Sequence, residues 1–319
     1  MELLNNIKFN YHIKELEDYF SNKNFTKACS VLKDIFDKDA NTFVKLFIFF
    51  ENKYFQNQHS NNFYNNKITW INSFDSQDTV FINKFLNFYL LSTKNSFENT
   101  SYSSTLKKII NEKNINNFKN QIQFDDFIKF SNLFQNLILF YFDNKSIFLN
   151  SRAAFFESNG GKYFTYPNLT QSYLLIVRNP QTLYSRYKNN YSSNQTALNE
   201  IFNYDQELVT ENDIHIYENR KSWNVHTKSW TDPNVKSTFN GKIIKFEDLL
   251  HAPEDVLIEI LYHLKESGIN IDLKFDVVRE FLNSFTLEDE IYEPISNQEK
   301  KLLIRDIDKS LLSFFKYTI

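Results

Sequence analysis

The chain of 319 residues carries a formal net charge of −3, and 42% of its residues are hydrophobic. This length and composition suit one large α/β domain with an appendage, and they exclude a wholly disordered chain. The charges form no basic footprint for nucleic acid, the single cysteine excludes an internal disulfide, and the six histidines lack metal-ligand spacing.

The N-terminal sequence predicts helices. Residues 1–20 are polar and mixed in charge, without the apolar core of a signal peptide, and the chain has no stretch of about 18 apolar residues. We therefore expect a cytoplasmic protein without a membrane span. Over residues 10–50, apolar residues recur mostly every three or four positions, which is typical of helices.

A short helical segment, residues 1–60, is expected to precede the main domain at 67–319. Residues 24–28, followed by 39–41, resemble one tetratricopeptide-type helical hairpin. A single hairpin cannot bury its own apolar face, so it should pack on the main domain, although an ordinary helical pair is the alternative. Such a segment would also suit a protein partner.

The main domain alternates strand and helix patterns after a polar linker at 56–66. Asp78 is a suitable N-cap for a helix that begins at Thr79, and residues 94–145 indicate mostly helices and loops. Further helices are expected after Pro180 and at 253–265. The β-branched and apolar runs predict strands at 67–73, 146–149, 173–177 and 242–246. This alternation predicts a three-layer α/β sandwich with a mostly parallel central sheet.

Four segments, in order, resemble the sulfotransferase family that uses 3′-phosphoadenosine 5′-phosphosulfate (PAPS). The first is an Arg-Asn-Pro motif directly after a strand, and the second is a Trp-x-x-His…Trp helix. The third is a strand ending in Phe-Glu-Asp-Leu, and the fourth is a later Ser-Phe pair. They occupy residues 173–180, 223–230, 242–250 and 283–285. The resemblance covers roughly residues 67–315.

The resemblance implies a P-loop-like fold and transfer of a sulfuryl group from PAPS to a hydroxyl or amine of a small-molecule or glycan acceptor. It implies that Arg178 contacts the donor's 3′-phosphate, since arginine forms bidentate charge-assisted bonds to phosphate. Thr79 stands at the phosphosulfate-loop threonine and Ser185 near a phosphate-binding serine. Phe246 and Phe285 stand at positions that flank the adenine.

The donor-binding motifs are degraded. The family's loop contains Lys, Gly and Trp, whereas residues 73–80 contain none of them and place Asp75 and Asp78 there. Carboxylates disfavour a phosphosulfate, because such a site depends on backbone N–H groups and positive charge. Ser185 follows Arg178 by seven residues rather than the family's eight, and the C-terminal loop that clamps the 3′-phosphate is missing.

The family's catalytic base is also replaced. Its Lys and His align with Asn150 and Arg152, and arginine cannot act as a base near neutral pH. His226 is the nearest substitute base by motif, although a structural role suits a Trp-x-x-His helix. Arg178 has the alternative of pairing with a carboxylate, and the two phenylalanines have the alternative of being core residues.

Three functions stay open from the sequence. The chain is an active sulfotransferase, or a catalytically inactive binding or scaffold protein with that fold, or an enzyme that uses another nucleotide or phosphorylated ligand through Arg178. The degraded loop, base and clamp favour the second, and the retained Arg178 favours the first or third. The acceptor is set by variable loops and cannot be predicted.

Overall fold

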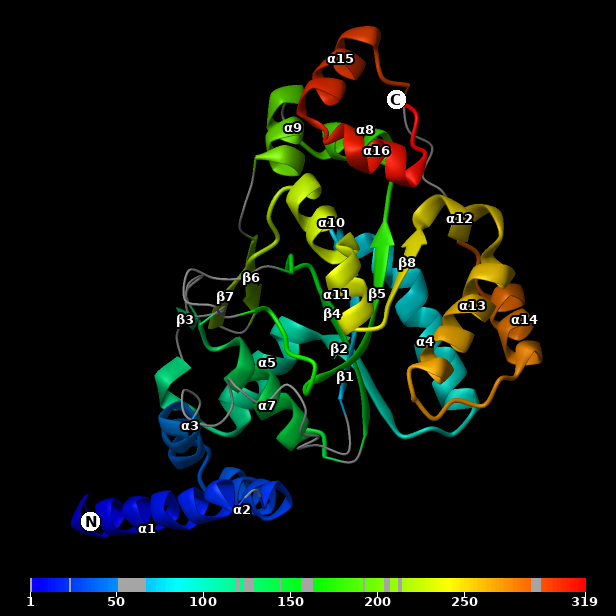
Figure 1. The fold of residues 1–319 in the computed structure, drawn as a ribbon. Coiled ribbons are helices and arrows are strands. Elements are labelled where there is room, and N and C mark those ends of the chain that lie inside the picture. Colours follow the sequence, from blue (N-terminus) through cyan, green and yellow to red (C-terminus); the bar gives the residue numbers. More distant parts are fainter. Residues whose placement is uncertain are drawn as a thin grey trace.

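A computed structural model describes residues 2–22, 24–50, 67–118, 121–122, 129–143, 145–155, 163–191, 193–203, 207–211, 214–287 and 294–319. The proposed linker at 56–66 lies outside these residues. Figure 1 shows a central sheet with helices on both faces, which confirms the α/β prediction.

The central sheet has five strands in the order β2-β4-β1-β5-β8, and all of its pairings are parallel. The four predicted strands are all present and differ from their predicted bounds by a few residues at most. The fifth strand, β2, lies at one edge of the sheet, in a region that was not predicted to contain a strand. The bounds are β1 Ile68–Ser73, β2 Phe97–Ser101, β4 Ser146–Ser151, β5 Thr170–Val177 and β8 Gly241–Lys245.

The inner strand β5, between β1 and β8, is buried on both faces because its side chains alternate between two cores. Tyr173, Leu175 and Val177 belong to one cluster of buried residues, and Leu174 and Ile176 belong to the other. This alternation is the expected consequence of the strand's two-residue side-chain period. The continuous apolar run was therefore a reliable signal for a strand covered by helices on each side.

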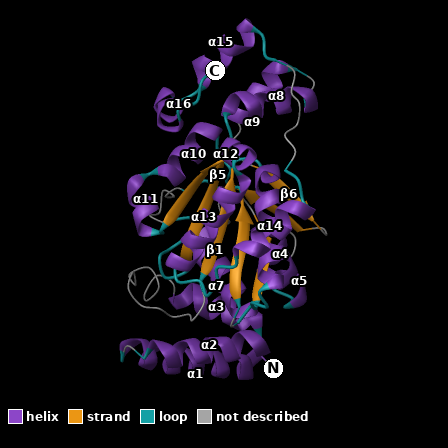
Figure 2. Cartoon of the chain, turned by 90° about the vertical axis from the view of Figure 1, so that its right-hand side faces the viewer, coloured by secondary structure: helices purple, strands orange, loops and turns teal. Residues whose placement is uncertain are grey.

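The two helical layers are visible in Figures 1 and 2. One layer, over the second core, contains α4 Val80–Ser92, α12 Phe246–His251, α13 Pro253–Glu266 and α14 Phe275–Ser284. The other layer contains α5 Tyr102–Glu112, α7 Ser131–Tyr141, α10 Trp223–Thr231 and α11 Pro233–Thr238. Beyond the carboxyl ends of the strands lie α8 Pro180–Asn190, α9 Asn194–Phe202, α15 Asn297–Asp306 and α16 Lys309–Phe315. Short 3₁₀ turns also occur at η2 Ser76–Thr79 and η3 Asn116–Phe118.

The N-terminal segment forms α1 Glu2–Ser21, α2 Phe25–Lys38 and α3 Ala40–Phe50, at the end of the molecule opposite α15 (Figures 1 and 2). The rings of Phe36 and Phe43 contact Phe140 of α7, with centroids 6.1 and 5.2 Å apart. These helices thus share the first core with the main domain. A protein partner for them stays a prediction.

A second, small sheet has the order β3-β7-β6, with β3 Gln121–Ile122, β6 Glu207–Glu211 and β7 Ile214–Glu218. β6 and β7 pair antiparallel, and β3 adds parallel to β7. The expectation of mostly helices and loops over 94–145 omitted β2, which is short and mostly polar, and β3, which has only two residues. No described helix is long and apolar enough to cross a membrane.

Candidate functional site

The turn after β1 begins α4 as predicted, but with a different cap. Asp75 is the N-cap of the 3₁₀ turn, and its Oδ1 accepts a 3.0 Å bond from the backbone N–H of Gln77. Thr79, the N-cap of α4, makes no side-chain capping bond. The prediction that Asp78 caps the helix is therefore wrong: the 3₁₀ turn starts the helix three residues earlier, and the Asp78 carboxylate has other partners.

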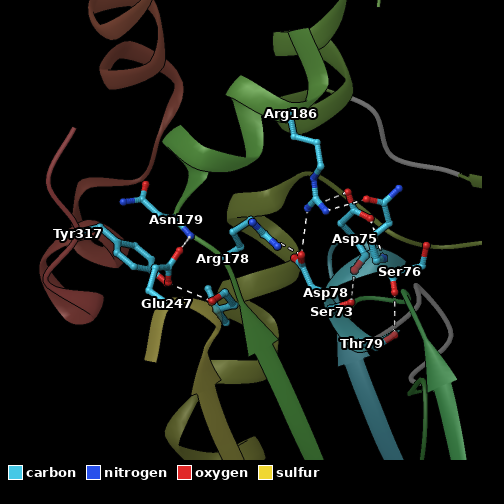
Figure 3. Close-up of polar contacts among 12 residues, drawn as sticks. Ser73, Asp75, Ser76, Asp78, Thr79, Arg178, Asn179, Arg186, Glu247 and Tyr317 are labelled. Atoms are coloured by element: carbon cyan, nitrogen blue, oxygen red, sulfur yellow. Dashed lines mark hydrogen bonds and ion pairs between the residues drawn. The ribbon is translucent and has the colours of Figure 1, made fainter. Parts of the chain in front are cut away.

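Those partners are two arginines. Arg178 Nε donates to Asp78 Oδ1 over 2.8 Å, and Arg186 Nη2 donates to the same oxygen over 3.0 Å. Arg186 Nη2 also lies 3.2 Å from Asp75 Oδ2, and its Nη1 donates to Gln77 Oε1 over 3.0 Å. Figure 3 shows the two guanidinium groups converging on the turn from the end of β5 and from α8. The carboxylate alternative for Arg178 is confirmed.

The network is buried and balanced in charge. Arg178, Arg186, Asp75 and Asp78 are all at most 6% exposed. Burial raises the pKa of Asp78 above its ordinary value, and the positive charges of Arg178 and Arg186 oppose that rise. The guanidinium of Arg178 also lies 3.6 Å from the ring centroid of Phe246, a cation–π contact. Each arginine is thus held by protein groups in a fixed orientation.

The Arg-Asn-Pro motif has a clear local role beside this network. The side chain of Asn179 accepts from the backbone N–H of Gln181 over 2.9 Å, and Pro180 is the first residue of α8. Both are favourable at a helix start. Glu247 of the Phe-Glu-Asp segment accepts from the backbone N–H of Asn179 over 2.8 Å and from Tyr317 Oη over 2.9 Å. These motif residues join β5, α12 and the C-terminus (Figure 3).

A cavity of about 400 Å³ opens beside the arginines, at the carboxyl end of the sheet where α/β proteins bind ligands. Arg178 and Arg186 line it, and Lys84 adds a further cation. Its other lining residues come from the turn, α4, α12, the last residue of α14 and the segment after it: Gln77, Val80, Phe81, Phe246, Ser284, Phe285, Thr286 and Leu287. The lining therefore combines apolar walls with polar groups.

Of the residues that the resemblance assigned to the donor, some line the cavity and others do not. Phe246 and Phe285 line the cavity together with Arg178. Phe285 is 38% exposed and its ring stacks on Phe281, whereas Phe246 is 4% exposed. Thr79 lies within the turn, where its hydroxyl donates to the Ser76 carbonyl over 2.8 Å. Ser185 is buried on α8, and the described cavity lining does not include it.

Arg186 is a site residue that was not predicted from the sequence. It follows Arg178 by eight residues, the spacing at which the resembled family has its phosphate-binding serine. One residue along a helix rotates a side chain by about 100°, which separates Arg186 from Ser185. The eight-residue spacing was thus a usable signal. The contact of Arg186 with Asp78 joins residues 108 positions apart and had no such signal.

The other side of the β1 end holds the candidate base residues. Arg152 Nε donates to the Phe74 carbonyl over 3.0 Å, and its backbone N–H donates to Glu218 Oε2 over 3.1 Å. Ser103 Oγ donates to the second oxygen of Glu218. Arg152 therefore contacts the residue that precedes the Asp75 turn.

His226 is 1% exposed, and its Nε2 lies 2.7 Å from Asn72 Oδ1. Burial, together with the charges of Arg152 and Arg220, lowers the pKa of His226 to about 3. With an amide oxygen as its partner, Nε2 carries the proton of a neutral imidazole. Asn72 Nδ2 and Trp230 Nε1 both donate to the Ala153 carbonyl, over 3.1 and 2.9 Å. This closed network favours a structural role for His226.

Comparison with known proteins adds no family. No protein-family model matches the chain, and no curated protein matches it either. Across the described residues, no group of three or more His, Cys, Asp or Glu side chains is placed to hold a metal ion.

Proposed function

We propose that this chain is a sulfotransferase-like binding protein, with a P-loop-like fold, that does not transfer a sulfuryl group from PAPS. Four motif segments in the family's order support the likeness. The all-parallel sheet and the position of Arg178 directly after β5 agree with it.

The observation that carries the proposal is the Asp78 carboxylate on the two cavity arginines. An arginine that binds phosphate must offer its charge to the ligand, and here Asp75 and Asp78 offset the charges of Arg178 and Arg186. A donor with a 3′-phosphate and a 5′-phosphosulfate would bring several more negative charges to this edge. The residues present do not fit such a donor.

The cavity fits a planar heteroaromatic ligand of low negative charge, such as a nucleoside. Phe285 offers a partly exposed ring, Val80 an exposed apolar side chain, and Ser284 and Thr286 hydroxyl groups. Stacking of a base on an aromatic side chain is worth about 1–3 kcal/mol. Lys84 is exposed, and no ion pair is present for it among the described residues, so one negative charge on the ligand is tolerable.

The lack of a base supports binding rather than transfer. Sulfuryl transfer to a hydroxyl requires a group that removes the acceptor's proton. Arg152 cannot remove a proton near neutral pH, and His226 is buried and hydrogen-bonded to Asn72.

Calorimetric titration of the wild type with adenosine and with 3′-phosphoadenosine 5′-phosphate tests the proposal. We expect adenosine to bind at least as tightly as the bisphosphate, and Phe285→Ala to weaken adenosine binding by about 1–3 kcal/mol. Phe314→Ala, which removes an exposed phenylalanine on α16, is the matched control and should leave binding unchanged. Micromolar binding of the bisphosphate that disappears in Arg178→Ala would contradict the proposal and support a sulfotransferase with a working donor site.

A further inference from the structure

The turn after β1 holds a carboxylate that helix capping does not explain. Asp75 already caps the 3₁₀ turn, and α4 begins at Thr79 without a side-chain cap. Asp78 is 2% exposed, and a buried carboxylate costs free energy unless charged partners compensate for it. One of its two oxygens, Oδ1, accepts hydrogen bonds from both arginines, over 2.8 and 3.0 Å. The position of this oxygen is therefore set by the arginines.

Guanidinium groups bind carboxylates and tetrahedral oxyanions alike through charge-assisted hydrogen bonds, and here two of them converge on one oxygen. Arg178 is held in place by its contact with Phe246, and Arg186 is held by Gln77 and Asp75. Both arginines line the cavity, so the position that the Asp78 carboxylate occupies lies next to a cavity open to solvent. The Asp78 carboxylate thus stands where an external oxyanion would accept the same two hydrogen bonds.

We propose that Asp78 is an internal ligand that closes an oxyanion site formed by Arg178 and Arg186, and that it is the residue that excludes strongly anionic ligands from the cavity. The inference rests on the proposed function, because it explains why that cavity takes a ligand of low charge. Neutralising Asp78 should open the site to sulfate. The ligand class of the opened site is a tetrahedral oxyanion.

The test uses inorganic sulfate on the full chain carrying Asp78→Asn, which keeps the shape of the side chain, and on Asp78→Ser, which leaves room for the ion. Each variant leaves the charges of two buried arginines only partly compensated, so both should melt at a lower temperature than the wild type. Sulfate in the low millimolar range should raise the melting temperature of each variant more than that of the wild type. Its affinity should be roughly tenfold or more above that of the wild type, as expected for a regained charge-assisted bond.

Glu200→Gln is the matched control. Glu200 Oε1 accepts a 2.7 Å bond from Arg220, which is 2% exposed, so this variant also leaves a buried arginine without its carboxylate. It should lose stability without a specific gain from sulfate, and it shows the general stabilisation that sulfate gives to any protein. Arg178→Gln combined with Asp78→Asn should remove the sulfate gain.

The outcomes are decisive for Asp78. A sulfate gain in Asp78→Asn or Asp78→Ser that exceeds those of the wild type and Glu200→Gln supports the inference, as does refolding of a variant in sulfate but not in chloride. Gains equal to the controls, or failure of sulfate to restore a variant that does not fold, would overturn it. Adenosine binding to the wild type is measured separately, so a cavity without a nucleoside ligand would defeat the proposed function while leaving the Asp78 result intact.

Discussion

Buried polar side chains lie on both sides of the β1 carboxyl end, and they are paired differently on the two sides. On one side, Asp75 and Asp78 meet Arg178 and Arg186 beside an open cavity. On the other side, His226 and Asn72 form a network of neutral groups that is closed to solvent. On the first side the charged groups line a cavity that a ligand can enter, whereas on the second side His226 and Asn72 pair as neutral groups away from solvent.

This contrast shows when a retained motif residue can still serve a ligand. The Arg-Asn-Pro motif and the Trp-x-x-His…Trp helix are both present, yet three of their residues bond to other groups of the protein. Asn179 caps α8, Trp230 donates to the Ala153 carbonyl, and Arg178 pairs with Asp78. A motif can therefore be kept for its contribution to folding, and ligand chemistry survives only where the side chain also lines a cavity.

Acid should destabilise the protein through His226, which is buried as a neutral imidazole. The pKa of His226 falls from its ordinary value near 6.5 to about 3 in the folded protein, so the unfolded chain takes up a proton that the folded chain refuses. Its contribution to stability is complete above about pH 6.5 and is lost as the pH falls toward 3. Between about pH 6 and 4, His226 should cost about 1.4 kcal/mol per pH unit in the free energy of unfolding.

Urea unfolding of the wild type and of His226→Gln across this range measures the effect. The glutamine amide can still donate to Asn72 but does not titrate, so the variant should show a shallower loss of stability in acid. Parallel pH dependences for the two proteins would mean that His226 is not buried as a neutral imidazole.

Thr79→Val should lower the folding stability by a smaller amount and leave ligand binding at the cavity unchanged. The Thr79 hydroxyl donates to the Ser76 carbonyl and accepts from Asn83 Nδ2 over 3.3 Å, and the side chain is buried. Losing it should cost about 1 kcal/mol of folding stability. Adenosine affinity should stay unchanged, because Thr79 is not part of the described cavity lining. A large loss of affinity with unchanged stability would return Thr79 to the ligand.

The sequence predicted the main strands because their apolar runs are long and covered by helices. It missed β2, whose residues 97–101 are polar and half-buried at the sheet edge, where alternation is weak. The placement of Arg178 after β5 also followed from the sequence. The pairing of Arg178 with Asp78 did not, because it depends on how two parallel strands, 100 residues apart, bring their ends together.

A double-mutant cycle between Asp78 and Arg178 measures how strongly the carboxylate and the guanidinium group stabilise each other. The free energy of unfolding is measured for the wild type, Asp78→Asn, Arg178→Gln and the double variant, with the exposed Lys242–Glu259 pair as the control cycle. A buried, charge-assisted bond predicts a coupling of about 1.5–3 kcal/mol, against about 0–1 kcal/mol for the surface pair. A coupling between Asp78 and Arg178 no larger than that of the surface pair would contradict the claim that Asp78 is the internal counter-ion of the cavity arginines.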